Sequence, residues 1–209
     1  MGTVETMLTD KGAATRGRIV AATADLILQR GVGGTSLDDI RLDTATSKSQ
    51  LFHYFPGGKN ELVLAIAAYQ MERVLEAQRP HLDELNTWHS WQSWRDAVVA
   101  HYGSQPHWGC PIGSLTTQLL GLHPDLGAAV VAHLDRWHGY LDAGLHRMHD
   151  AALLHPNAEP DRLATHVFAA LQGGLLLTQT ARSIEPLEAA LDGALDALRH
   201  HANPSTDAP

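Results

Sequence analysis

A cluster of hydroxyl, amide and cationic side chains lies between residues 47 and 59. It starts with Ser47-Lys48-Ser49-Gln50, continues with His53 and Tyr54, and ends with Lys59. Hydroxyls, amides and cations of this kind grip phosphate oxygens, and a glutamine amide also pairs with the edge of a base. The pattern indicates contact with a nucleic acid rather than bond-making chemistry.

Signatures of catalysis are absent from the sequence. It contains no glycine-rich phosphate loop and no HExxH, GxSxG or CxxC motif. Among the fourteen histidines, the closest pairs are His146-x-x-His149 and His200-His201. No cysteine or carboxylate cluster completes either pair, so we expect no metal site. We also expect no cofactor and no enzymatic activity.

Three short helical patterns position the cluster. Ile19, Ala22, Leu26 and Ile27 share one face of a helix that starts near Thr15 and stops at residues 31–34. The next two helices have apolar residues facing inward, and both begin with capping residues. The capping residues are Thr35 or Ser36 with Asp38 or Asp39, and then Ser47; the apolar residues are Leu37, Ile40, Leu51 and Phe55.

Two short helices after a longer packing helix predict a helix-turn-helix, in which the last helix enters the major groove of DNA. Lys48, Ser49, Gln50 and His53 then face outward. Gln50 has an alternative role, because Ser47-x-x-Gln50 is itself a capping box and could turn the amide back onto the backbone.

Charge is unevenly distributed along the chain. The formal net charge is −8, yet residues 11–59 hold seven basic and four acidic residues, about +3, which leaves about −11 for the rest. A basic head on an acidic body fits a head that meets phosphate. The single cysteine, Cys110, suits a reducing compartment. With no signal peptide and no long apolar run in the sequence, we expect a cytoplasmic protein without membrane contact.

The rest of the chain also has helical periodicity, so the predicted fold class is all-α. We expect further helices at about 60–78, 88–102, 111–121, 125–153, 161–183 and 186–201, with mobile tails at residues 1–12 and from Asn203. The predicted domains are a helix-turn-helix domain at 13–59 and an effector-binding and dimerisation domain at 60–202.

The helix-turn-helix segment resembles the TetR family. The resemblance is carried by Thr35-Ser36-Leu37-Asp38-Asp39-Ile40, by the run from Ser47 to Pro56, and by Lys59-Asn60-Glu61-Leu62. It implies that Lys48, Tyr54 and Lys59 contact phosphate and that Ser49 and Gln50 lie near base edges. The full set of expected DNA-contacting residues is Thr35, Ser36, Ser47, Lys48, Ser49, Gln50, His53, Tyr54 and Lys59.

Three positions depart from the family pattern. Ala45 occupies the position of the usual turn glycine, which predicts a turn that is either slightly strained or opened differently. Phe52 stands where the family has a phosphate-contacting tyrosine, and an additional glycine lies in Pro56-Gly57-Gly58. Arg16 and Arg18 could reach the DNA backbone or minor groove as an arm, or could be ordinary surface charge.

The last two helices of the family form a four-helix dimer interface. The pair Gly173-Gly174 lies in mid-helix, where glycine is unfavourable, and close approach of a partner helix would explain it. We therefore expect a homodimer, as a palindromic operator requires, and the alternative is packing inside one subunit. The expected interface residues are Leu171, Gly174, Leu175, Leu191 and Leu195.

The middle helices are the expected effector pocket, lined by Trp108, Cys110, Thr117, His133 and Trp137. Tryptophan walls, neutral polar groups such as Gln118 and the lack of lysine after Lys59 favour a small hydrophobic effector, neutral or cationic. Cys110 precedes Pro111 at a helix start, where a thiol pKa is lowered, so a redox or electrophile sensor is an alternative. A buried structural cysteine is the simpler interpretation.

The sequence thus predicts a DNA-binding transcriptional regulator. In the leading hypothesis it is a repressor that a small hydrophobic ligand releases from a palindromic operator. The alternatives are a regulator that switches through Cys110 and a helical enzyme or carrier.

Overall fold

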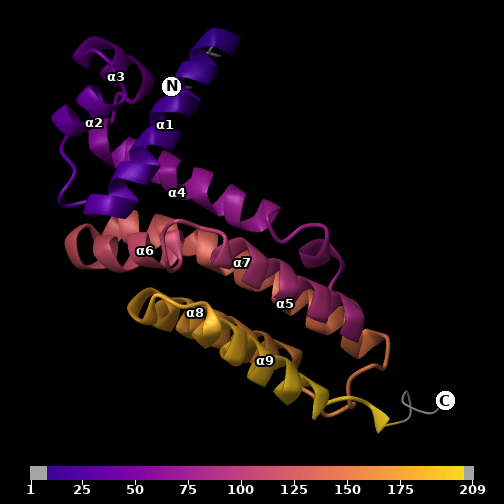
Figure 1. The fold of residues 1–209 in the computed structure, drawn as a ribbon. Coiled ribbons are helices and arrows are strands. Elements are labelled where there is room, and N and C mark those ends of the chain that lie inside the picture. Colours follow the sequence, from indigo (N-terminus) through magenta and orange to yellow (C-terminus); the bar gives the residue numbers. More distant parts are fainter. Residues whose placement is uncertain (1–8, 205–209) are drawn as a thin grey trace.

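The structure is a computed structural model, and it describes residues 9–204 apart from the side chain of Leu122. Within that range the chain is almost entirely helical (Figure 1). In chain order the elements are α1 (Asp10–Arg30), α2 (Leu37–Asp43), α3 (Lys48–Tyr54), α4 (Gly58–Glu76), the 3₁₀ helix η1 (His81–Glu84), α5 (Trp88–Gly103), α6 (Pro111–Leu122), α7 (Pro124–Asp150), α8 (Pro160–Ala181) and α9 (Glu185–Arg199).

The first three helices form a head that stands on the N-terminal half of α4 (Figure 1). Their start points follow from local chemistry, because both short helices have complete capping boxes. Ser36 and Asp39 cap α2, and Ser47 and Gln50 cap α3. Ile40 and Phe55 are fully buried, so apolar burial fixes the helices against one another.

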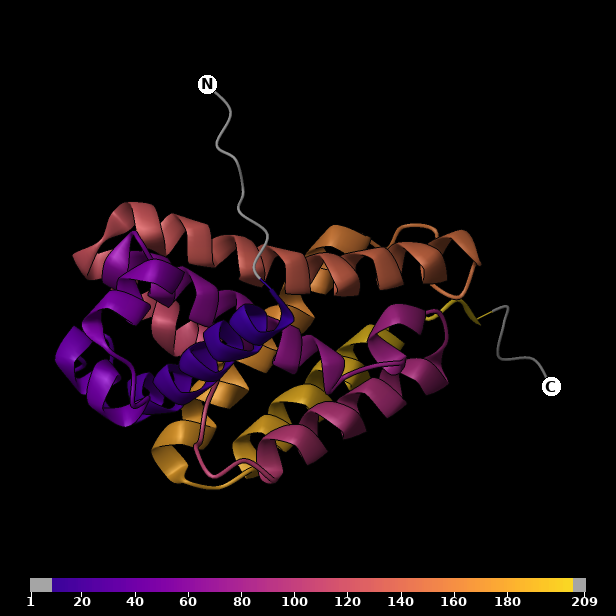
Figure 2. The same cartoon turned by 90° about the horizontal axis from the view of Figure 1, so that it is seen from above.

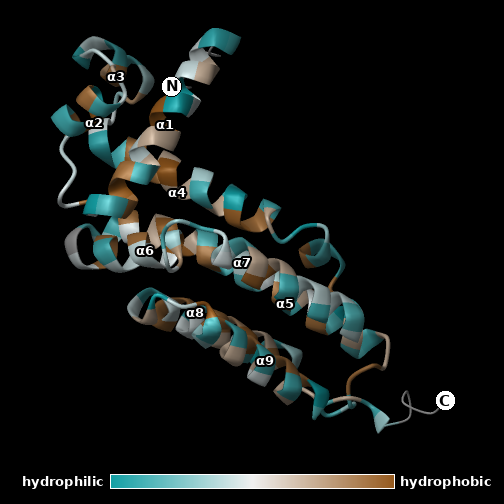
Figure 3. Cartoon of the chain, viewed as in Figure 1, coloured by the Kyte–Doolittle hydropathy of each residue, from teal (hydrophilic) through white to brown (hydrophobic). Residues whose placement is uncertain are grey.

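The remaining helices form the body. Seen from above, α7 lies along one side and α5 and α9 along the other (Figure 2). The helix α8 packs on both α9 and α7, and α7 also packs on α6. Brown and teal residues alternate around these helices in Figure 3, as expected for helices that bury one face.

Three tryptophans occupy the core of the body rather than a cavity. Trp91, Trp94 and Trp137 are buried. The fully buried Gln78 accepts hydrogen bonds from the indoles of Trp94 and Trp137, at 2.8 and 3.0 Å. Its own amide donates to the carbonyl of Val74 at 2.7 Å, so Gln78 satisfies two indole donors inside an apolar core.

The predicted fold class and helix order are confirmed, with corrections at the edges. The helix α1 begins at Asp10 rather than near Thr15, because the Thr9 side chain caps it. The 3₁₀ helix at His81–Glu84 was not predicted. The predicted tails are only partly covered, since residues 1–8 and 205–209 lie outside the described range, whereas Asn203 is hydrogen-bonded to Leu153 and Ala152. Among the described helices none is long and apolar enough to cross a bilayer.

Candidate nucleic-acid interface and cavity

The helix α3 lies at the end of the molecule opposite α8 and α9 (Figure 1), and its first residues are polar. Lys48, Ser49 and Gln50 are all exposed, as is His53 one turn further on. The Lys48 side chain makes no hydrogen bond or ion pair within the described residues, so its ammonium is free to meet an external anion. Tyr54 is half-buried and stacks edge-on against His53 with ring centroids 5.0 Å apart.

Buried and bonded groups hold α3 in this position. Leu51 and Phe55 anchor its inner face in the core of the head. Arg18 of α1 donates to the carbonyl of Thr44 at 2.6 Å, which ties α1 to the turn between α2 and α3. Ala45 in that turn has a φ of +48°, so the strain predicted from the missing glycine is present.

The capping box of α3 uses the side-chain oxygen of Gln50 but not its NH₂ group. Its side-chain oxygen accepts the backbone N–H of Ser47 at 3.1 Å, and the Ser47 hydroxyl accepts the N–H of Gln50 at 3.1 Å. The alternative role of Gln50 as a cap is therefore realised. Because only the oxygen is used, the NH₂ group can still donate to a neighbouring acceptor.

Two residues expected at the interface have internal roles instead. Thr35 is fully buried and its hydroxyl donates to the carbonyl of Gly31 at 2.8 Å, so it does not face DNA. The ammonium of Lys59 donates to the carbonyl of Val32 at 2.6 Å. The Lys59 side chain bonds across 27 residues of sequence, a contact that no local pattern reveals.

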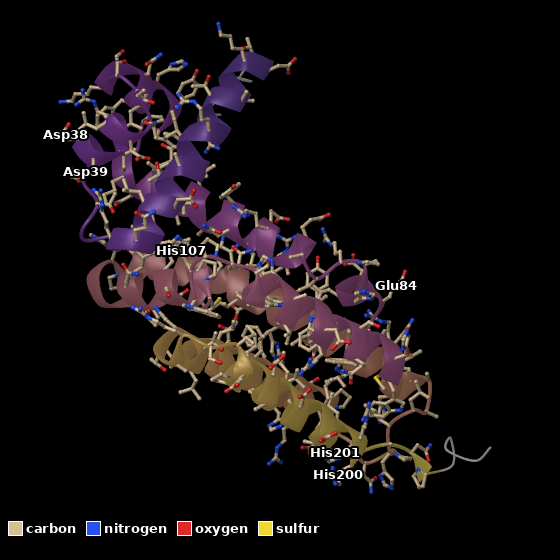
Figure 4. The ribbon with its side chains drawn as sticks, in the orientation of Figure 1. Asp38, Asp39, Glu84, His107, His200 and His201 are labelled. Atoms are coloured by element: carbon tan, nitrogen blue, oxygen red, sulfur yellow. The ribbon has the colours of Figure 1, made fainter. Side chains whose placement is uncertain are left out.

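The start of α2 is acidic, which limits the side of the head that can face DNA. Figure 4 labels Asp38 and Asp39 on this helix. Hydrogen bonds from the side chain and backbone of Ser36 hold the pKa of Asp39 below its usual range. Asp38 pairs with Arg41 at 2.6 Å. Ser36 is exposed but committed to Asp39, so Lys48, Ser49 and Gln50 remain the better candidates for contact.

Arg16 and Arg18 do not extend as an arm. The guanidinium of Arg16 lies over the Phe55 ring, 4.9 Å from its centroid, and Arg18 bonds the Thr44 carbonyl. Both guanidinium groups therefore contact residues of the head itself and contribute to its stability.

The expected dimer-interface residues are buried inside the subunit. Leu171, Leu175 and Leu191 are fully buried, and Leu195 nearly so. A Cβ added at Gly174 would lie 3.0 Å from the Cα of Leu187, so the helix that approaches closely is α9 of the same chain. The alternative of internal packing is correct for these five residues.

A cavity of about 460 Å³ lies where the head meets the body. Its lining comes from the end of α1, from α4, from the end of α5 and the loop that follows, from α6, and from Gln179 on α8. Of the residues expected to line a pocket, Trp108 and Cys110 do so. Thr117 is exposed outside it, Trp137 belongs to the core, and His133 lies near Glu72 and Arg136.

The wall chemistry differs from the expectation. The lining includes Gln29, Gln70, Gln105, Gln118 and Gln179, together with the cation of Arg73. Aromatic walls are limited mainly to Trp108 and Tyr102, because the other tryptophans fill the core or lie elsewhere. This cavity therefore lacks the tryptophan-walled, cation-free lining that the sequence predicted for an effector pocket.

Cys110 caps the start of α6, and its sulfur accepts the N–H of Gly113 at 3.3 Å. Burial raises the pKa of the Cys110 thiol, and the N–H groups of Gly113 and Ile112 only partly oppose this. The expected lowering by the helix start is therefore outweighed. Burial also raises the pKa of the neighbouring Tyr102 well above its usual value.

His146 lies close to two carboxylates, and one of them comes from a different helix. His146 of α7 lies 2.7 Å from Asp161 of α8 and 3.8 Å from Asp142. The ligand atoms of the three residues lie within 4.8 Å of one another. This cluster was missed because Asp161 comes from another helix. His146 and Asp161 are exposed, and their contact joins α7 to α8 as an ion pair does.

A rigid three-helix head with an exposed polar helix start, standing on a helical body, defines a helix-turn-helix transcriptional regulator. Comparisons with known proteins agree. The model of bacterial regulatory proteins of the tetR family matches residues 19–66, and that of the tetracyclin repressor-like C-terminal domain matches residues 90–194. The chain belongs to the TetR family of DNA-binding transcriptional regulators and is not an enzyme.

Relatives and solved structures extend over most of the chain. An HTH-type transcriptional regulator from Lactococcus lactis is 27% identical over 187 residues, 85% of this chain and 90% of the relative. The repressor NemR of Escherichia coli K12 is 26% identical over 185 residues, again 85% and 90%.

Two solved structures share the architecture. A TetR regulator from Chloroflexus aurantiacus superposes with a TM-score of 0.78 at 25% identity and covers 93% of this chain and 98% of its own. The reduced form of E. coli NemR gives 0.67 at 25% identity and covers 90% and 97%.

Proposed function

We propose that this protein is a repressor that binds a palindromic operator as a homodimer and leaves it when a small molecule binds the body. The observation that carries the DNA-binding part is the exposed start of α3. Lys48, Ser49 and Gln50 project there from a helix whose other face is anchored in the head. The printed name of NemR as a repressor supports the direction of regulation.

The contacts divide into two kinds. Lys48 supplies a cation for phosphate, which contributes affinity regardless of sequence. Ser49 and the free NH₂ group of Gln50 supply donors for base edges, which contribute specificity. Lys59 is better described as a group that positions the head, because its ammonium is bonded to Val32.

The proposed dimer uses the outer face of α8 and α9, on the side away from the buried leucines. This outer face consists of Ala169, Gly173, Leu176 and Leu177 on α8 and of Ala189 and Gly193 on α9. Leu176 and Leu177 are 61% and 56% exposed, which is unusual for leucine. A Cβ added at Gly173 or Gly193 would meet nothing within 4 Å, so both positions leave room for an approaching helix.

The DNA contact is tested with the salt dependence of operator affinity, using a duplex selected from random sequences. Each lost phosphate contact should lower the slope of log K against log salt by about 0.9, so Lys48→Ala in a dimer should lower it by about 2. Arg147→Ala removes a cation from the body and should leave the slope unchanged. An unchanged slope in Lys48→Ala would show that α3 is not docked as proposed.

The dimer face is tested by sedimentation of Leu176→Lys. A charge placed in a buried apolar interface should convert the dimer to monomer and reduce operator affinity with it. The matched control is Leu120→Lys, an exposed leucine of α6, which should stay dimeric. A dimer that survives Leu176→Lys would place the interface elsewhere.

A further inference from the structure

Phe52 is an exposed aromatic residue on the helix that carries the proposed DNA contacts. It is 39% exposed, and among the described residues no other phenylalanine, tyrosine or tryptophan is exposed. Aromatic rings contribute most to stability when they are buried, so an exposed ring in a proposed interface is a candidate contact residue. The polar contacts proposed for Lys48, Ser49 and Gln50 do not account for it.

Helix geometry places Phe52 beside two of these polar residues. Residues three and four positions apart are neighbours on the surface of a helix, so Phe52 lies next to both Ser49 and Lys48 on α3. These three residues are exposed, whereas Leu51 and Phe55 are buried in the core of the head. Phe52 therefore belongs to the face of α3 that points away from that core.

The turn after α3 supports one edge of the Phe52 ring. A Cβ added at Gly58, the first residue of α4, would lie 3.6 Å from Cε1 of Phe52, so the ring lies close to the glycine backbone. Gly58 has a φ of +66°, which favours glycine, and it belongs to the Gly57-Gly58 pair that departs from the family pattern. Two of the departures from that pattern are thus neighbours in the structure.

The exposed surface of Phe52 is apolar, which limits its partner. The family has a phosphate-contacting tyrosine at this position, but Phe52 has no hydroxyl to donate. An apolar ring placed against a phosphate would displace water from the anion without replacing its hydrogen bonds, which is unfavourable. The partner of Phe52 in a complex with DNA should therefore be apolar.

The base edges in the major groove carry one apolar substituent, the C5-methyl group of thymine. Their other recognition groups are hydrogen-bond donors and acceptors, which suit Ser49 and the NH₂ group of Gln50. Contact between a phenyl ring and a methyl group removes apolar surface of both from water, and the gain is proportional to the area that is buried. A phenyl ring on the reading helix thus favours thymine over the other bases.

We propose that Phe52 determines operator specificity by packing against the C5-methyl group of one thymine in each half-site. The proposal rests on the proposed function and adds an apolar specificity residue to its polar contacts. Lys48 binds phosphate, Ser49 and Gln50 donate to base edges, and Phe52 selects the methyl group beside them.

The first test removes the methyl group from the DNA and leaves the protein unchanged. In an operator selected from random sequences, each thymine is replaced in turn by deoxyuridine, which keeps the base pair and lacks only the methyl group. At one thymine of a half-site the wild-type affinity should fall about fourfold, and about fifteenfold when both half-sites carry the change. An operator that contains no thymine with this effect would overturn the proposal.

The second test asks whether Phe52 is the residue that contacts the methyl group. Phe52→Ala should bind the thymine and deoxyuridine operators equally well, and Phe52→Leu, which keeps a smaller apolar side chain, should retain part of the difference. The matched control is Leu42→Ala, which shortens an exposed apolar residue of α2 in the same head and should retain the full difference. A Phe52→Ala protein that keeps the wild-type difference would show that another residue contacts the methyl group, against the proposal.

Failure of this proposal is separable from failure of the proposed function. A wild-type protein that binds its operator and ignores deoxyuridine at every thymine refutes only the role of Phe52. If Phe52→Ala then weakens both operators by the same factor, the ring packs on the sugar-phosphate backbone instead. A protein that selects no duplex refutes the proposed function, and the role of Phe52 with it.

Discussion

The hydrogen bond from Val32 to Gln118 should control how firmly the head is held by the body. Gln118 accepts the Val32 N–H at 2.8 Å across 86 residues of sequence. Gly31 beside it has a φ of +74°, and a Cβ there would lie 2.9 Å from the Gln118 oxygen. The loop is therefore shaped around this side chain. Gln118→Leu keeps the approximate size and removes the acceptor.

The expected loss is modest and measurable. A hydrogen bond whose removal leaves a partly buried donor unsatisfied is worth about 1–3 kcal/mol, and the partial exposure of this bond places it near the lower end. About 1.4 kcal/mol corresponds to a tenfold faster opening of the loop. For a chain of about this length, the same loss lowers Tm by roughly 3–6 °C.

The assay is amide hydrogen exchange of the loop between α1 and α2, with Tm measured alongside. Amide exchange at Val32 should accelerate about tenfold in Gln118→Leu. It should remain unchanged in the control variant Gln92→Leu, which makes the same substitution on α5 away from the loop. A cycle with Lys59→Met should be non-additive, because both side chains hold the two ends of one residue. Wild-type exchange and Tm in Gln118→Leu would refute the role assigned to this bond.

The remaining predictions concern strain, the thiol and pH. Ala45→Gly should stabilise the protein by about 1 kcal/mol, because glycine adopts the φ of +48° without strain; a lower denaturation midpoint would contradict this. Cys110→Ser should retain operator binding and release, and the wild-type thiol should alkylate slowly with iodoacetamide at pH 7, since burial raises its pKa. Burial lowers the pKa of His101 in the folded state, so stability should fall as pH drops through the unfolded value of about 6.5. His101→Gln should make that fall shallower, and equal slopes would exclude His101 as its source.

The head could be predicted because its determinants are local. Capping boxes at Ser36 and Ser47 and the apolar spacing of Leu51 and Phe55 act within one or two turns. Even the strain at Ala45 follows from one missing glycine. The exposed start of α3 then follows from helix geometry alone, with the other face already buried.

Contacts between distant segments could not be predicted. The acceptor of Lys59 lies 27 residues away, and that of Trp137 lies 59 residues away. An apolar stripe shows that a face is buried but not what covers it, so the leucines of α8 and α9 were assigned to a partner subunit. The outer face combines small residues with Leu176 and Leu177, and of these residues only Gly173 stood out in the sequence, as half of the Gly173-Gly174 pair.

The cavity was misjudged for a related reason. Tryptophan content was taken as wall chemistry, yet large aromatics contribute most when they are buried, and Gln78 satisfies two of the indoles in the core. Glutamines are common on surfaces, so their convergence on one cavity becomes visible only when α1, α4, α6 and α8 are placed together.

The Val32 residue gives the head two attachments of different kinds. Its carbonyl is bonded to Lys59 on α4, which is continuous with the head, and its N–H is bonded to Gln118 on α6, which lines the cavity. A ligand that competes for the Gln118 amide would loosen only the second attachment. The head would then stay folded on α4 while its orientation relative to α6 changes. In the proposed dimer, two heads would have to match two half-sites about one helical turn apart, so a small change in orientation would be enough to lose the operator without unfolding the head.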